Sequence, residues 1–410
     1  MSLAPTEPAA RIQSLDVMRG FAVLGILAVN AAFFAAPWQA AVSPLQAPLA
    51  VDETTLWSWL VMHVFFEFKC ITLFSILFGA SLYMVGGERA DKDKGKVLHR
   101  RLIWLLIFGL IHALVIWYGD ILVTYAITGF LVMFARSWKP RTLMIVGIVL
   151  YLLAAALQGM LALILPIIPP DKLSSVEQEL AAVFALSAEE LARLTAAYQS
   201  GYPAAMMENI GTWTQFFLSS AFGLVIRTAG VMMIGMALFK WGFLSGRSPG
   251  WVYGLMLALG AAALAIVGYQ AWLNWQAGFE LLHMTSAGMM ANTIFSIFVS
   301  IGYASLFVLI AKAGIGFLSG PLAAVGRMAF TNYLTQSLIM TTIFWGGWRG
   351  FGLWGEVDRP TLWAIVLGVW ALQLIWSPLW LSRFQMGPLE WVWRSLSYGR
   401  PVRLSRPAAA

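Results

Sequence analysis

Residues 110–129 read LIHALVIWYGDILVTYAITG, and the predicted fold is built outward from this stretch. The pattern predicts the end of one apolar helix, a tight turn at Gly119 and Asp120, and the start of a second helix. His112 lies within the apolar run and Asp120 lies at the turn. Ionisable side chains are costly in hydrocarbon, so both are candidates for a functional site. The structural alternative is a histidine with satisfied hydrogen bonds and an aspartate that caps the next helix.

The composition places the chain in a membrane. Of its 410 residues, 60% are hydrophobic and only 11% are charged, whereas soluble domains carry about 25% charged residues. Long apolar runs recur from end to end, which predicts an all-α integral membrane protein with about ten transmembrane helices. We expect these spans at 15–36, 56–85, 101–118, 121–136, 142–167, 212–239, 250–273, 290–311, 321–345 and 361–382.

Lys and Arg are distributed unevenly around the predicted spans. With the N-terminus in the cytoplasm, 18 of the 26 Lys and Arg residues flank the spans on the inner side, 4 flank them on the outer side and 4 lie within spans. The positive-inside rule therefore predicts that both termini are cytoplasmic. The resulting segments are a cytoplasmic tail at 1–14, a polytopic transmembrane domain at 15–383 and a basic cytoplasmic tail at 384–410. The net charge of +7 favours contact with anionic lipids and argues against a nucleic-acid partner.

Residues 170–210 differ from the rest of the chain because they are acidic and have apolar residues at helical spacing. Ser187 followed by Glu190 forms a capping box. We expect short amphipathic helices on the extracytoplasmic side, between the fifth and sixth spans. They would act as a lid or lie on the bilayer surface.

The first predicted helix carries a polar stripe. Asp16 and Arg19 are three residues apart, and Asn30 follows Arg19 by eleven residues, so all three share one helix face. This stripe indicates a path that is lined by polar side chains and runs from the cytoplasmic surface outward. The alternative is an interfacial arginine that pairs with Asp16 and extends to the headgroups.

Further charges lie deeper in the predicted membrane region. His63 and Glu67 are four residues apart on one face of the second span, and Lys69 points elsewhere. Arg227 lies midway along the sixth span with no acid nearby in sequence. A buried charge needs a partner, so we expect Arg227 to form an ion pair with Glu67.

The ninth span begins a polar arc at Arg327 that includes Asn332. Such an arc either joins helices or lines a cavity, and the arginine favours the cavity. At the predicted depths, Arg19 and Arg327 form a positively charged opening near the cytoplasmic side. His63, His112 and Asp120 lie further towards the outside. This arrangement suits an anionic carrier, such as a coenzyme A thioester, that enters from the cytoplasm. One cysteine and four histidines show no metal-ligand spacing, so we expect neither a metal site nor a tightly bound cofactor.

Five ordered motifs support a family resemblance. They are LDVMRGFAVLGILAVN at 15–30, FEFKCITLFSILFGA at 66–80, RRLIWLLIFGLIHALVIWYGDILVTYAITG at 100–129, VGRMAFTNYLTQS at 325–337 and GPLEWVWRSLSYG at 387–399. With them the chain resembles the YeiB-like bacterial membrane family, long described as a domain of unknown function. That family looks like a branch of the transmembrane acyltransferase superfamily, whose other branches move acyl groups from acyl-CoA to sugars of glycans. The resemblance implies a multi-pass protein of the bacterial cytoplasmic (inner) membrane.

The resemblance also bears on the catalytic base. In one large branch of the superfamily, an arginine of the first helix is followed eleven residues later by a catalytic histidine. Arg19 fits this pattern, but position 30 is Asn, and residues 31–55 contain no histidine. Either the base implied by the resemblance is His112 or His63, of which His112 lies within a family motif, or this branch no longer transfers acyl groups.

Two functions remain open at this stage. The first is an acyltransferase that moves an acyl group, such as acetyl, from cytoplasmic acyl-CoA to a hydroxyl or amine of a sugar, glycan or lipid. His112 would be the general base, Asp120 or Glu67 would orient it, and Arg19 and Arg327 would hold the donor phosphates. The other candidate binding residues are Asp16, Asn30, His63, Lys69, Arg227 and Asn332. The second is a transporter or lipid-handling protein that uses the same polar cavity without catalysis. For both functions the protein can be a monomer or a homodimer.

Overall fold

The computed structural model describes residues 12–347 and 350–406. Most of the predicted N-terminal tail, Arg349 and the last four residues of the predicted C-terminal tail lie outside the described residues. The described part has eight helices that are long and apolar enough to cross a membrane, as expected for a multi-pass membrane protein. They are α1 (Gln13–Ala35), α3 with α4 (Glu53–Phe65 and Lys69–Gly86), α5 (Lys92–Ile111) with the π-helical turn His112–Ile116, α7 (Pro140–Gln158), α11 (Tyr202–Lys240), α12 (Gly250–Gln276), α14 (Met290–Lys312) and α17 (Arg359–Arg383).

The other two expected spans are present as shorter helices. The expected span 121–136 is α6 (Leu122–Val132) with a short 3₁₀ turn, too short for the roughly 20 residues that a span needs. The expected span 321–345 is divided at Met328 into α15 (Gly316–Arg327) and α16 (Ala329–Phe344). The structure therefore supports eight spans by length and leaves the expected count of ten unconfirmed.

The second expected span is also broken. α3 ends at Phe65 and α4 starts at Lys69, and Phe68 between them has a left-handed backbone with φ of 61°. A left-handed conformation is unfavourable for a bulky residue, so the surrounding contacts must hold it in place. The break turns the carbonyl of His63 towards the Lys69 side chain, which donates a hydrogen bond to it at 2.7 Å.

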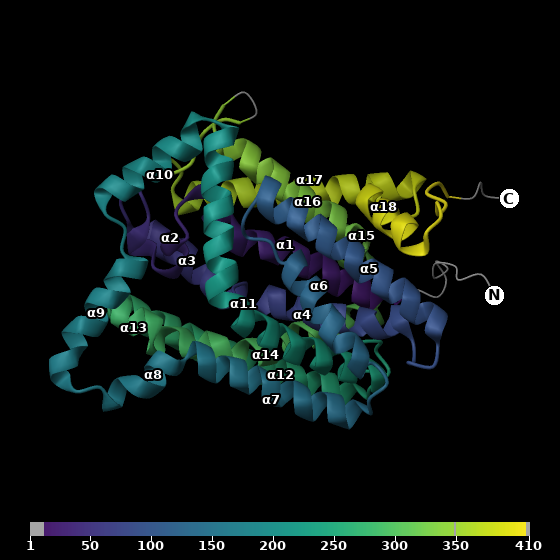
Figure 1. The fold of residues 1–410 in the computed structure, drawn as a ribbon. Helices are drawn as coiled ribbons and strands as arrows, with labels where there is room; N and C mark the ends of the chain where they lie inside the picture. Colours follow the sequence, from purple (N-terminus) through teal and green to yellow (C-terminus); the bar gives the residue numbers. More distant parts are fainter. Residues whose placement is uncertain (1–11, 348–349, 407–410) are drawn as a thin grey trace.

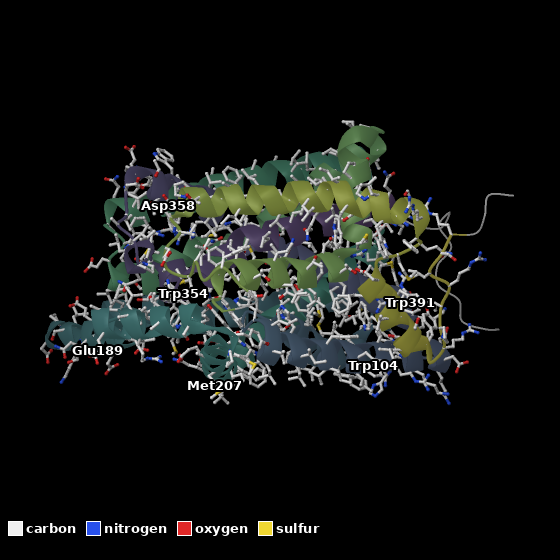
Figure 2. The ribbon with its side chains drawn as sticks, turned by 90° about the horizontal axis from the view of Figure 1, so that it is seen from above. Trp104, Glu189, Met207, Trp354, Asp358 and Trp391 are labelled. Carbon is white, nitrogen blue, oxygen red and sulfur yellow. The ribbon has the colours of Figure 1, made fainter. Side chains whose placement is uncertain are left out.

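The acidic insert forms helices, as expected. α9 (Pro170–Phe184) and α10 (Ala188–Ser200) follow α7 and the short α8 (Met160–Ile164), and the Ser187 hydroxyl accepts a hydrogen bond from the N–H of Glu190 at 3.1 Å. α10 packs against α11. Figure 1 shows α9 and α10 at the end of the bundle opposite to α18 (Pro388–Tyr398), and Figure 2 shows Glu189 of α10 and Trp391 of α18 at opposite ends. Which end faces the cytoplasm rests on the Lys and Arg distribution alone.

α1 is the central helix of the bundle (Figure 1). It contacts α4, α14, α15, α16 and α17. In its apolar 18-residue stretch 72% is buried inside the protein, against 28% in the corresponding stretch of α17. α17 carries an outward row of apolar side chains that are more than half exposed: Leu367, Leu372, Ile375 and Leu379. A soluble protein would bury such a face, whereas a bilayer covers it.

The close crossing of α4 and α11 relies on two glycines. A Cβ atom at Gly235 of α11 would lie 2.1 Å from the carbonyl oxygen of Ile76 in α4, and a Cβ atom at Gly79 of α4 would lie 2.0 Å from the carbonyl oxygen of Met232. The backbones of α4 and α11 therefore approach more closely than any larger residue allows. Such small-residue contacts are typical of helix association in membranes.

Candidate active site

A cavity of about 410 Å³ lies between α1, α4, α5, α6, α15, α16 and α18; we call it the basic cavity. It is at the end of the bundle where α1 begins and α18 ends, because both Ile12 and Tyr398 line it. Five basic side chains line it, together with two acidic ones. They are Arg19, Lys94, Arg101, Arg327 and Arg394, with Asp16 and Glu390. The net positive charge of this wall favours an anionic ligand.

The lining of the basic cavity changes from charged to apolar along its helices. On α1, Arg19 is followed by Val23 and Ile26, and on α5, Arg101 is followed by Leu105. The seven helical steps from Arg19 to Ile26 span about 10 Å. A ligand with an anionic head and an apolar end fits this gradient, with its head near α18 and its apolar end deep in the bundle.

Arg19 and Arg327 both reach the basic cavity, as the sequence predicted. Arg19 forms an ion pair with Asp16 at 2.8 Å, and the side chains are 25% and 14% exposed, so ligand atoms can still reach them. Arg327 donates a hydrogen bond to the carbonyl of Gln385 at 3.0 Å. The Arg101 guanidinium lies over the Trp393 ring of α18, 4.0 Å from the ring centre. These contacts hold the cationic side chains along the wall.

Asn332 and Asn30 do not line the basic cavity. Asn332 is fully buried and joins three helices: it donates to the Val325 carbonyl and to the Ser377 hydroxyl, both at 3.1 Å, and accepts from the Trp376 indole at 2.9 Å. The hydrogen bonds of Asn332 thus join helices, and its role as a binding residue stays a prediction.

Glu390 is a residue of this region that sequence reasoning missed. Its carboxylate accepts hydrogen bonds from the N–H groups of Phe330 and Thr331, at 2.7 and 3.1 Å, and from the Thr331 hydroxyl at 2.5 Å. These N–H groups are unpaired at the start of α16 because the helix is broken at Met328. Burial raises the pKa of Glu390, and these hydrogen bonds partly offset the rise. Glu390 of α18 thus caps α16 from 60 residues away in sequence.

His112 and Asp120 come together, as predicted. The Nδ1 atom of His112 lies 2.8 Å from Oδ1 of Asp120, and both side chains are fully buried. The helix does not continue to Asp120, because the chain leaves the π-helical turn at Trp117 with extended backbone. Asp120 Oδ2 also accepts from the N–H of Val123 at 2.7 Å, so the aspartate caps α6 as well. π-helical turns inside helices are frequent at functional sites.

His112 itself lies outside the lining of the basic cavity. His112 is 0% exposed and does not line the cavity. Tyr333 lines the cavity instead, and its ring centre lies 5.2 Å from that of His112. The histidine therefore lies directly behind Tyr333, at the apolar end of the cavity that is deep in the bundle.

Ser337 completes the group around His112. Its Oγ atom lies 2.9 Å from Nε2 of His112, and the serine is 2% exposed. We call His112, Asp120 and Ser337 the His112 cluster. Two sequence signals were available for Ser337: it is the last residue of the motif at 325–337, and it lies four residues after Tyr333 and thus on the same face of α16.

Glu67 belongs to a different group. It pairs with His63, whose Nδ1 atom lies 2.5 Å from Oε2 of Glu67, so Glu67 does not orient His112. Lys69 is fully buried and donates to Oδ1 of Asn292 at 2.5 Å. These four residues, the His63 cluster, lie at the break between α3 and α4 and beside α14, and none of them lines the basic cavity.

The predicted ion pair between Glu67 and Arg227 is wrong. No such pair occurs within 4 Å in the described part of the chain. Arg227 instead donates to the Ser296 hydroxyl at 3.0 Å, and its guanidinium lies over the Phe68 ring, 4.4 Å from the ring centre. A hydroxyl and an aromatic face thus take the place of the expected carboxylate.

The described residues contain no group of three His, Cys, Asp or Glu side chains that could hold a metal ion. The arrangement around His112 instead suits proton transfer. A carboxylate fixes one ring nitrogen of an imidazole, and the other nitrogen faces a hydroxyl.

Comparison with known proteins places the chain in a family. A family model described as "Protein of unknown function (DUF418)" matches residues 238–400. The chain is 33% identical to the uncharacterized protein YxaH of Bacillus subtilis (strain 168), covering 97% of this chain and 96% of the relative. It is also 33% identical to the uncharacterized protein YeiB of Escherichia coli (strain K12), covering 96% and 97%. No solved structure matches. These near full-length similarities show that the chain belongs to the YeiB-like family.

Proposed function

We propose that this protein is an acyltransferase of the bacterial cytoplasmic membrane that uses cytoplasmic acyl-CoA as donor. The observation that carries the proposal is the adjacency of two features. A histidine held by a buried carboxylate lies behind the wall of a cavity, and the opposite end of that cavity carries five basic side chains. Phosphates bind to clustered Arg and Lys, and a base acts on a group brought within hydrogen-bond reach.

In this proposal the basic cavity holds the donor. Arg19 and its basic neighbours contact the phosphates of coenzyme A, and the thioester end lies along the apolar part near Ile26. Tyr333 separates this part from His112, so its side chain must turn aside for the thioester to reach the histidine.

His112 is the base of the transfer and Asp120 is its positioning residue. Asp120 keeps the proton of the imidazole on Nδ1, which leaves the lone pair of Nε2 free to take a proton. The acceptor supplies a hydroxyl or amine and takes the acyl group. The His63 cluster lies at a separate helix break and has no assigned step in this mechanism.

Donor binding gives the direct test. A thermal-shift titration of the purified protein with acetyl-CoA should raise the unfolding temperature in a saturable way. Arg19→Ala should weaken binding by about 10–100-fold, because a hydrogen bond to a charged group contributes about 1.5–3 kcal/mol. The matched control is Arg247→Ala, which removes an exposed arginine that does not line the cavity. Absence of binding by acetyl-CoA and by longer acyl-CoA would favour the transporter or lipid-handling alternative.

The orientation of the cavity has its own test. If the end formed by α18 is cytoplasmic, a membrane-impermeant maleimide added to intact cells should label Glu189→Cys and leave Asp93→Cys unlabelled. Both positions are exposed, and Cys70→Ala removes the native thiol, which is buried. Labelling in the opposite pattern would place the basic cavity on the outer side, out of reach of cytoplasmic acyl-CoA.

A further inference from the structure

Ser337, His112 and Asp120 are arranged in the order of a nucleophile, a base and an orienting acid. The Ser337 hydroxyl lies 2.9 Å from Nε2 of His112, and Nδ1 of the same ring lies 2.8 Å from Asp120. The three side chains come from α16, the π-helical turn and the turn before α6. Such a group is recognised by its geometry and by the roles of its members, on whatever fold it occurs.

The hydrogen bonds fix the direction of each proton. The ionised Asp120 carboxylate only accepts, so the proton between it and His112 is on Nδ1. In the neutral imidazole, Nε2 then has a free lone pair and the Ser337 hydroxyl donates to it. The serine proton therefore already points at the base that would remove it.

Ser337 also differs from three threonines of α16. Thr335, Thr341 and Thr342 each donate to a carbonyl of their own helix, at 2.9, 2.9 and 2.7 Å. This local bond is the usual state of a hydroxyl inside a membrane helix. The corresponding contact of Ser337, to the Tyr333 carbonyl, is 3.4 Å long. Ser337 is thus turned towards His112 and away from its own helix.

We propose that Ser337 is the nucleophile of the transfer and carries the acyl group as a covalent ester. The inference rests on the proposed function. The Ser337 oxygen attacks the thioester carbon, the C–S bond breaks and a C–O bond forms. The serine proton passes to Nε2 of His112 and then to the sulfur of the released coenzyme A.

In the second step an acceptor hydroxyl or amine attacks the acyl-serine. His112 removes the acceptor proton, the bond from the acyl carbon to Ser337 breaks, and the proton returns to the serine oxygen. No oxidant, metal or further reactant is needed. The burial of all three side chains keeps water away from the ester, which limits its hydrolysis.

Trp117 is placed to assist this chemistry. Its indole N–H is buried and has no hydrogen-bond partner among the described residues, and its ring centre lies 6.3 Å from that of His112. A buried donor without a partner is unfavourable. A negative charge on the acyl oxygen during the attack would provide the missing acceptor.

The test is intact-protein mass spectrometry after acid quenching of the purified protein with acetyl-CoA and no acceptor. The wild type should gain the mass of one acetyl group, located to the peptide that contains Ser337, with release of coenzyme A. Ser337→Ala should lose the adduct and lower coenzyme A release by about 10³-fold or more. In Ser337→Cys the adduct should become a thioester that neutral hydroxylamine removes. Ser305→Ala is the matched control, because Ser305 is fully buried and bonds only to its own helix at Ile301.

The outcomes separate the two proposals. Donor binding and coenzyme A release without an adduct, or with full activity in Ser337→Ala, would overturn the covalent step and leave an acyltransferase with direct transfer. Failure of both acetyl-CoA and longer acyl-CoA to bind would overturn both proposals. An adduct on Ser337 that disappears in Ser337→Ala and persists in Ser305→Ala supports the inference.

Discussion

His112→Asn is expected to lower the proposed acyl transfer by about 10²–10⁴-fold, because it removes the proposed base and keeps a donor for Asp120. Asparagine has an N–H₂ group near the position of Nδ1 but no basic nitrogen. Alanine at this position would instead leave the fully buried Asp120 carboxylate without its histidine partner, which costs about 1–3 kcal/mol or more. The measurement is the rate of coenzyme A release by the purified variant, with candidate acceptors present.

Two comparisons make this result specific to His112. The affinity for acetyl-CoA should stay within about twofold of wild type, because His112 does not line the basic cavity. His283→Asn is the control substitution, since His283 bonds to Asn274 at 2.9 Å and lies outside both polar clusters. If His112→Asn keeps full turnover, His112 has no part in the mechanism and His63 becomes the remaining candidate base.

Gly235→Ala is expected to destabilise the protein by about 3 kcal/mol, at the upper end of the usual range for an overpacked site. Its Cβ atom would lie 2.1 Å from the backbone oxygen of Ile76, so α4 and α11 must move apart. Backbone atoms cannot turn aside as a side chain can. The free energy of unfolding can be measured by titration with sodium dodecyl sulfate in mixed micelles.

Gly223→Ala in the same helix is the control. A Cβ atom there meets no atom within 4 Å, so the substitution should be neutral or stabilise the helix by up to about 1 kcal/mol. Equal stabilities of the two variants would show that the close approach of α4 and α11 does not limit the size of residue 235.

The long helices were predictable because their signal is local. Runs of about 20 apolar residues predict spans regardless of what surrounds them. The breaks at Phe68 and Met328 were not predictable, because neither position is occupied by Gly or Pro. Each break depends on a contact between two helices. Lys69 of α4 donates to the His63 carbonyl of α3, and Glu390 of the distant α18 satisfies the N–H groups after Met328. Such partners are set by tertiary packing, to which residue spacing along one helix gives no guide.

The site residues that could be predicted are those whose side chains are costly to bury. An ionisable group in an apolar run needs a partner, and this reasoning paired His112 with Asp120 correctly. It failed for Arg227, because the guanidinium contacts Ser296 and the Phe68 ring, and the sequence does not identify such uncharged partners. This reasoning also missed Ser337, because the hydroxyl of a serine in a membrane helix normally donates a hydrogen bond to a carbonyl of its own helix.

Because Glu390 of α18 caps α16, the membrane domain does not end at α17 but includes α18. A truncation after Arg383, the last residue of α17, would appear to remove only a basic tail. It would also remove the Glu390 carboxylate and leave the N–H groups of Phe330 and Thr331 buried without an acceptor. α16 carries both Tyr333 and Ser337, so its start would loosen at one end of the proposed site. The shortest version of this protein that keeps the site intact therefore extends through α18, and affinity tags belong after Tyr398.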